Sequence, residues 1–307
     1  ATNDLISESL DVHLPSSAIF SLDELRLKQS LDGLLKKASS EEIVYFPTTD
    51  GEMIRFRIKE KSNFSPVLAA KFPDIKAYRG FSIDHPEITM YFSNSSQGLE
   101  AVLIDASSNV RTTISKVPKT GNKYIAYTEL YRSRAGEALS CSTPEPPSAS
   151  SKFKASSHNQ VNLAGQMSRL TKFSDESALS TYRLAVAVNG QYTEFHGGTK
   201  QLALAAINNT LTGLNFIFET DLGIKLELID NNDEIVYLDS DTDPFEDIID
   251  SNTNAVLQST IDSVIGSSNY DIGHLFSGTG GGGNAGAIGS VCSASTKGSA
   301  WSASGSP

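Results

Sequence analysis

Five histidines are the first candidates for metal chemistry in this chain, but their spacing does not form a metal site. They are His13, His85, His158, His196 and His274. A helical zinc site places two neutral imidazoles at positions i and i+4, with a glutamate beside them as general base. No two of the five are four residues apart, and none is followed by Glu. We therefore expect no catalytic zinc ligand in these 307 residues. The apolar surroundings of His274 predict a core histidine, and His196, which precedes two glycines, is predicted to have a surface or capping role.

Three aspartates have the spacing of a calcium-binding loop. Asp239, Asp241 and Asp243 stand at positions one, three and five, as in an EF-hand. Position six is Pro244 where that loop needs glycine, and position twelve is Asp250 instead of Glu. Ca²⁺ is therefore a weak candidate ligand, and a generic acidic loop is the alternative.

The chain contains two cysteines, Cys141 and Cys292. They could be unrelated free thiols or could pair with each other, and Cys292 could also pair with a cysteine outside this sequence. Spacing alone does not choose between these arrangements.

The glycine run 280–283 could be mistaken for a phosphate-binding loop. It lacks the Gly-Lys-Ser/Thr ending of such a loop, and no helix is expected after it. We interpret it as a flexible connection into a strand at 285–291. Gly and Ala would keep that strand flat and accessible to another backbone.

Length and charge limit the classes of protein. A chain of 307 residues exceeds the usual size of one domain, so two domains are expected. The net charge of −11 argues against nucleic acid or an anionic membrane as partner. No apolar run is long enough to span a bilayer, and no signal-peptide pattern opens the sequence, so any signal peptide has been removed or left out. The acidic composition, rich in Ser, Thr and Asn, fits an exported protein, so we expect secretion.

The first part of the chain predicts a β-rich domain with a leading helix. A capping-box pattern at Ser21–Glu24 opens a stretch with helical spacing of leucines. Short β-like runs follow, separated by turn signals, at 43–46, 53–58, 88–92, 99–104, 110–114 and 124–127. This domain is expected to cover residues 1–135. Residues 136–178, which include a Pro/Ser-rich stretch, are expected to be a linker.

The last part of the chain alternates strand and helix patterns. The apolar run 184–188 is typical of a strand buried on both faces. Strands are also expected at 224–229, 235–238 and 270–276, with helices through Leu211 and Ile261. This order predicts an α/β layer with a mainly parallel sheet over residues 179–307.

Several segments of the sequence resemble one family of proteins. Residues 64–78, with Leu68-Ala69-Ala70-Lys71-Phe72-Pro73, resemble the pro-domain of reprolysin-like (adamalysin-type) secreted metallopeptidases, especially those of Bacteroidetes. The resemblance continues through 182–197 and 243–245. Its most specific part is Tyr270-Asp271-Ile272-Gly273-His274, followed by the glycine run and Val291-Cys292.

The resemblance implies an α+β architecture. A β-rich pro-domain would precede a metzincin-like N-terminal subdomain with a mainly parallel sheet and an antiparallel edge strand. The parent enzyme would be a zinc-dependent endopeptidase made as a zymogen. Its substrates would be proteins or peptides, and its zinc ligands would lie in the remainder of the catalytic domain, beyond residue 307.

The resemblance also assigns roles to residues. In the family, an edge strand binds substrate by β-augmentation, and this role carries over to Gly286, Ala287, Ile288 and Gly289. Cys141, between the two halves, could hold the fourth zinc position as a latency device, or could be a plain linker cysteine. This chain alone is expected to be inactive. The alternative is a non-catalytic binding or inhibitory module derived from a peptidase pro-domain.

Overall fold

The structure is a computed structural model that describes residues 17–36, 42–108, 110–118, 120–128, 143, 179–245, 249–250, 252–305 and 307. The chain divides into two compact units. Unit 1 comprises Ala1–Ser62 and Asp74–Ala135, and unit 2 comprises Asn63–Pro73 and Gly136–Pro307. Residues 63–73, from the first part of the sequence, group with the second unit. Helices and strands are mixed, with one large antiparallel and one smaller mixed sheet, which is consistent with the α+β class.

Unit 1 is built on an eight-stranded antiparallel sheet with the order β1-β8-β7-β6-β5-β4-β3-β2. Its strands are β1 (Ser17–Ser21), β2 (Glu42–Pro47), β3 (Met53–Glu60), β4 (Lys76–Ser82), β5 (Ile88–Ser95), β6 (Gly98–Asp105), β7 (Val110–Lys116) and β8 (Lys123–Thr128). The six strands predicted from the sequence are confirmed, while β1 and β4 were not predicted.

The core of unit 1 lies between this sheet and helix α2 (Glu24–Lys36). In β3 every second side chain is buried, with Phe56 fully enclosed, as alternation along a strand requires. Leu31 of α2 joins the same core. The helix begins one residue after Asp23, whose carboxylate accepts a 3.0 Å hydrogen bond from the Arg26 N–H. The predicted capping box at Ser21 was therefore wrong, because Ser21 belongs to β1 and Asp23 caps the helix.

Unit 2 contains a five-stranded sheet with the order β10-β9-β11-β13-β12. Its strands are β9 (Ser180–Val188), β10 (Ile224–Leu228), β11 (Ile272–Ser277), β12 (Gly281–Asn284) and β13 (Ala300–Ser304). The first four in the spatial order run parallel, and β12 is antiparallel to β13. Unit 2 also contains the helices α3 (Pro66–Lys71), α5 (Gly190–Phe195), α6 (Lys200–Leu222) and α7 (Thr253–Val264) and the short 3-10 turns η3 (Asn232–Ile235) and η4 (Ser267–Asn269).

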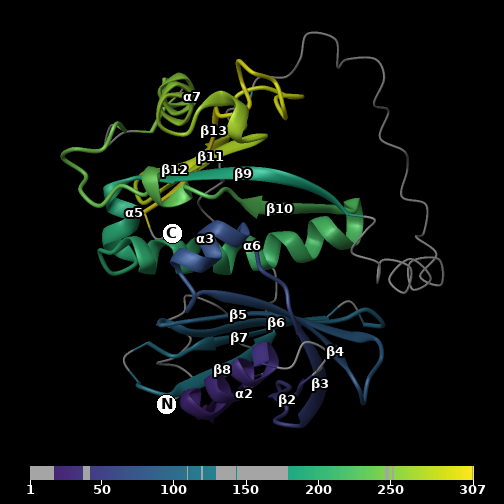
Figure 1. Cartoon of the computed structure of the whole chain (residues 1–307). Coiled ribbons are helices and arrows are strands. Elements are labelled where there is room, and N and C mark those ends of the chain that lie inside the picture. The colour runs from purple at the N-terminus through teal and green to yellow at the C-terminus, as the bar shows by residue number, and fades with distance from the viewer. Residues whose placement is uncertain are drawn as a thin grey trace. The chain divides into compact units, whose positions relative to one another are not determined.

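Helices cover both faces of this sheet, with α6 on one side and α7 on the other (Figure 1). Strand β9 is buried throughout its second half, as its apolar run predicts. Ala185 and Ala187 pack in one cluster with Leu257 and Ile261 of α7. Thr199 caps the start of α6 through its side-chain oxygen, and Gly223 ends that helix with a left-handed φ of 67°.

The expected strands of unit 2 differ from the structure at residues 235–238 and at β13. Residues 235–238 do not form a strand, because η3 ends at Ile235 and only Val236 makes an isolated bridge, to Val188. Strand β13 was not predicted. Among the described residues, no helix has the length and apolar character needed to cross a bilayer.

Candidate functional site

Strand β12 is the outermost described strand of the unit 2 sheet and its only antiparallel one. Its four residues are Gly281, Gly282, Gly283 and Asn284, paired in register with Ser304 to Trp301 of β13. A Cβ added at Gly281 would meet no atom within 4 Å. The glycine run therefore places a strand without side chains at one end of the sheet, and sheet edges are where extended peptides can add as a further strand.

The residues to which substrate binding was assigned lie just beyond this strand. Gly286, Ala287, Ile288 and Gly289 form bends and turns, so the predicted strand at 285–291 was wrong. Gly286 and Gly289 have φ values of 72° and 80°, which an extended strand does not allow. The Asn284 side chain accepts a 2.7 Å hydrogen bond from the Gly286 N–H, and this turn ends the strand.

A residue from the predicted linker contacts the end of this edge. The Ala285 N–H donates a 2.8 Å hydrogen bond to the Thr143 hydroxyl oxygen. Thr143 follows Cys141 by two residues. Cys141, the latency candidate, lies outside the described residues.

Cys292 is an exposed free thiol among the described residues. Its backbone has a φ of 62°, and its N–H donates a 3.0 Å hydrogen bond to the Asp271 carbonyl oxygen. Pairing of Cys292 with Cys141 or with a cysteine outside this sequence stays a prediction.

The aspartates of the predicted calcium loop bind backbone groups instead of converging on one point. The Asp239 carboxylate accepts from the Asp241 N–H at 2.9 Å. The two oxygens of Asp243 accept from the N–H groups of Phe245 and Gly190, both at 2.8 Å. Within the described ranges no group of three or more His, Cys, Asp or Glu side chains could hold a metal ion. Asp243 therefore ties the loop that follows η3 to the start of α5, and calcium binding by this loop stays a prediction.

His274 and His196 contact neighbouring side chains of their own unit. His274 is half-buried in β11, where its Nε2 lies 3.0 Å from the Ser302 hydroxyl and its ring packs edge-on against Phe276. Burial lowers its pKa to about 4. His196 caps the end of α5, its ring contacts the Tyr192 and Phe195 rings, and burial lowers its pKa. The predicted core and capping roles agree with these contacts.

The shift at His274 makes unit 2 sensitive to acid. The unfolded chain binds a proton at His274 below about pH 6.5, whereas the folded chain does so only near pH 4. Stability is therefore lost as the pH falls from 6.5 towards 4. We expect His274→Gln to reduce the loss of unfolding free energy between pH 7 and pH 5 by about 1–2 kcal/mol, since the ring is half-buried. Urea unfolding monitored by tryptophan fluorescence measures the free energy of unfolding of unit 2, because the single tryptophan, Trp301, lies in β13.

His85→Gln is the matched control for this experiment. His85 lies in unit 1, 3.5 Å from Glu87, so its removal should leave the Trp301 transition unchanged at both pH values. An identical acid sensitivity in wild type and His274→Gln would contradict the prediction.

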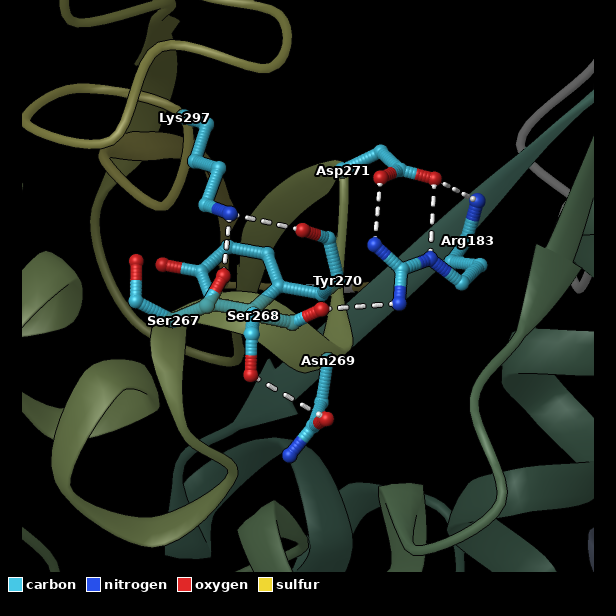
Figure 2. A network of polar contacts seen from close by, with 7 residues as sticks. All are labelled: Arg183, Ser267, Ser268, Asn269, Tyr270, Asp271 and Lys297. Atoms are coloured by element: carbon cyan, nitrogen blue, oxygen red, sulfur yellow. Dashed lines mark hydrogen bonds and ion pairs between the residues drawn. The ribbon is translucent and has the colours of Figure 1, made fainter.

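A polar cluster that the sequence did not predict fixes the amino ends of β9 and β11. We call Arg183, Ser267, Ser268, Tyr270, Asp271 and Lys297 the amino-end network (Figure 2). The Arg183 guanidinium donates to both Asp271 oxygens, at 2.7 and 3.1 Å, and to the Ser268 carbonyl at 2.9 Å. The Lys297 ammonium binds the carbonyls of Ser267 and Tyr270.

The amino-end network has a structural role. Arg183 holds the pKa of the Asp271 carboxyl below its usual value, and Lys297 lies 4.4 Å from the centre of the Tyr270 ring. These contacts tie together β9, the turn η4 and the loop that precedes β13. Tyr270 and Asp271 thus help to position the central strands of the sheet.

The carboxyl ends of the same strands are closed by Asn189, which is fully buried. Its Oδ1 accepts from the N–H groups of Tyr192 at 3.1 Å and Gly278 at 2.9 Å, and its Nδ2 donates to the Ser277 hydroxyl at 3.0 Å. Ligands of open α/β sheets bind at this end, in a crevice between loops. Here the loops touch, because a Cβ at Gly278 would overlap the Tyr192 backbone. The edge strand β12 is therefore the candidate binding site that remains.

One comparison with known proteins assigns a family to the second half of the chain. Residues 178–307 match the model of a family described as Metallo-peptidase family M12B, reprolysin-like. Among curated proteins, none matches the chain. The matched region begins at β9 and contains the whole five-stranded sheet. Residues 178–307 of this chain are therefore similar to the M12B reprolysin-like family of metallopeptidases.

Proposed function

We propose that the chain is the pro-domain and the N-terminal part of the catalytic domain of a secreted zinc-dependent endopeptidase, in zymogen form. The observation that supports this most directly is β12, an antiparallel edge strand on an otherwise parallel sheet, inside the region that matches a metallopeptidase family. A peptidase must hold its substrate in an extended conformation, and the edge of a strand can do so through backbone hydrogen bonds that are independent of side chains.

In this proposal, substrate adds to β12 as a further strand. The three glycines of β12 keep side chains away from the incoming peptide. The strand begins at Gly281 and ends at Asn284, where the hydrogen bond from the Gly286 N–H to the Asn284 side chain forms a turn. Protein or peptide substrates in extended conformation are the partners that such an edge fits.

The residues of this chain do not fit a catalytic zinc ion. Members of the M12B family are zinc-dependent. Among the described residues, no three or more His, Cys, Asp or Glu side chains are grouped so that they could hold a metal ion, and no pair of the five histidines has helical zinc spacing. We propose that the zinc ligands and the catalytic base come from sequence outside these 307 residues, and we derive no catalytic step from the present ones.

The zymogen state is supported by the contact between Thr143 and Ala285. That hydrogen bond brings a residue of the 136–178 segment to the end of β12. A segment at this edge would compete with substrate for it. Ligation of zinc by Cys141 stays an alternative hypothesis for latency.

We expect the 307-residue chain to bind far less than one zinc per molecule and to cleave no protein, since it lacks a ligand set. A longer product of the parent gene that contains a His-Glu-x-x-His sequence should bind about one zinc and, after removal of residues 1–178, cleave casein. Metal analysis and a fluorescent casein assay, with and without chelator, measure both properties. Chelator-sensitive activity of the 307-residue chain would contradict the placement of the ligands. A zinc-loaded longer chain without peptidase activity would contradict the proposed function.

A further inference from the structure

Residues 63–73 belong to the N-terminal part of the sequence but pack in unit 2. We call Asn63–Pro73 the anchor segment. Residues 62 and 74, on either side of it, belong to unit 1. The anchor segment therefore leaves unit 1, enters unit 2 and returns within eleven residues. Its contacts show what holds it there.

The first contact extends the unit 2 sheet beyond β10, the strand at the end opposite β12. Phe64 forms a parallel bridge with Leu228. The Leu228 N–H donates to the Asn63 carbonyl at 2.8 Å, and the Ser65 N–H donates to the Leu228 carbonyl at 2.9 Å. The anchor segment thus pairs with an edge strand through its backbone, and Phe64 is 2% exposed.

The second contact is a buried polar network on α6. Asn63 is 3% exposed. Its Nδ2 donates to Asn208 Oδ1 at 3.0 Å and to the Thr212 hydroxyl at 2.9 Å, and its Oδ1 accepts from Asn215 Nδ2 at 2.9 Å. Asn208 and Asn215 are themselves buried, so without Asn63 they would lose a partner away from water.

The third contact is helix α3, which follows directly. Ser65 caps it, with its hydroxyl accepting a 3.3 Å hydrogen bond from the Leu68 N–H, and Pro66 occupies its start. Leu68 is fully buried. At its end, the Lys71 ammonium lies 2.9 Å from Asp233 in a solvent-exposed ion pair, a type of contact that contributes little to stability.

We propose that the anchor segment is a non-covalent clamp that keeps the N-terminal part of the chain bound to residues 179–307 after the connecting segment has been cut. The interaction surface is the edge of β10 together with Asn208, Thr212 and Asn215 of α6. Its partner is the Asn63–Pro73 segment of the same chain. Cutting between residues 136 and 178 would then yield a two-chain protein, and release of the N-terminal part would need a further event that breaks the clamp. This inference does not depend on peptidase activity.

The test uses the full chain with a site-specific protease sequence inserted between Ser150 and Ser151. After cutting, the two fragments are run on a sizing column at low micromolar concentration. We expect the wild-type fragments to elute together. Asn63→Ala should raise their dissociation constant about 10–100-fold, because three hydrogen bonds to buried groups are lost. Circular dichroism of the uncut variant checks that both units are folded.

Two controls are matched to this variant. Lys71→Ala removes the exposed ion pair of the same segment and should leave co-elution unchanged. Thr143→Val removes the hydrogen bond between Thr143 and Ala285, a contact of the N-terminal fragment that lies outside the anchor segment. This variant should also leave co-elution unchanged. Release by Thr143→Val but not by Asn63→Ala would overturn the proposal, as would separation of the wild-type fragments immediately after cutting.

Hydrogen exchange of the cut wild-type protein gives a test that needs no variant, should Asn63→Ala fail to fold. The amides of Ser65 and Leu228 bind across the clamp and should stay protected after cutting. Fast exchange at both amides in co-eluting fragments would show that another contact holds them together and would overturn the proposal.

Discussion

Gly190→Ala is expected to destabilise unit 2 by about 3 kcal/mol. Gly190 begins α5, directly after β9. A Cβ at this position would overlap the backbone of Asp239 and Ser240, which cannot rotate away as a side chain can. The loop that carries Asp243 would have to shift, and the 2.8 Å hydrogen bond from the Gly190 N–H to Asp243 would be strained or lost. Urea unfolding followed by Trp301 fluorescence reports this loss in unit 2 alone.

Gly213→Ala is the matched control. Gly213 lies inside α6, where an added Cβ would meet no atom within 4 Å. Alanine favours the helix more than glycine does, so we expect this variant to be more stable than wild type by about 0.5–1 kcal/mol. The same substitution should thus have opposite effects at two positions of one unit. Equal stability of Gly190→Ala and wild type would contradict the close backbone approach.

Asn215→Ala should cost unit 2 about 3 kcal/mol. The Asn215 side chain binds both backbone groups of Leu226, each at 2.8 Å, and also Asn63. It therefore joins α6, β10 and the anchor segment, and alanine would leave three buried polar groups without this partner. The urea midpoint of the Trp301 transition measures the change.

Thr210→Ala on the same helix separates this effect from a general loss of helix stability. Thr210 is exposed, and its hydroxyl makes only a local 3.3 Å hydrogen bond to the Ala206 carbonyl. Its replacement should change the free energy of unfolding by no more than about 0.5 kcal/mol. Similar losses for both variants would show that Asn215 has no special role.

The elements that were predicted correctly are those with a strong side-chain pattern. The β-like run at 53–58 identified β3, in which buried and exposed side chains alternate, and the apolar run at 184–188 identified β9. Helical spacing in the same way identified α6 and α7. In each case one or both faces are buried, so the spacing of apolar residues in the sequence indicates whether the backbone is a helix or a strand.

The candidate site was predicted less well, because its residues carry no such pattern. In β12, glycine has no side chain that could alternate, so the strand was placed too late in the chain. In β13, small residues surround Trp301, and they obscured the strand. Asn63 could not be identified at all, because Asn208, the partner it binds, lies 145 residues further along the chain.

That sequence separation also affects how the protein is made. The ribosome adds about 5–20 residues per second, so Asn63 emerges on the order of ten seconds before Asn208. During this interval the strands of unit 1 can pair through largely local hairpins, while Phe64 and Leu68 have no sheet or helix of unit 2 to cover them. The nascent chain thus presents an apolar stretch between two strands of a forming domain. Folding of unit 2 can finish only when α6 and β10 have been synthesised and have returned to this early segment.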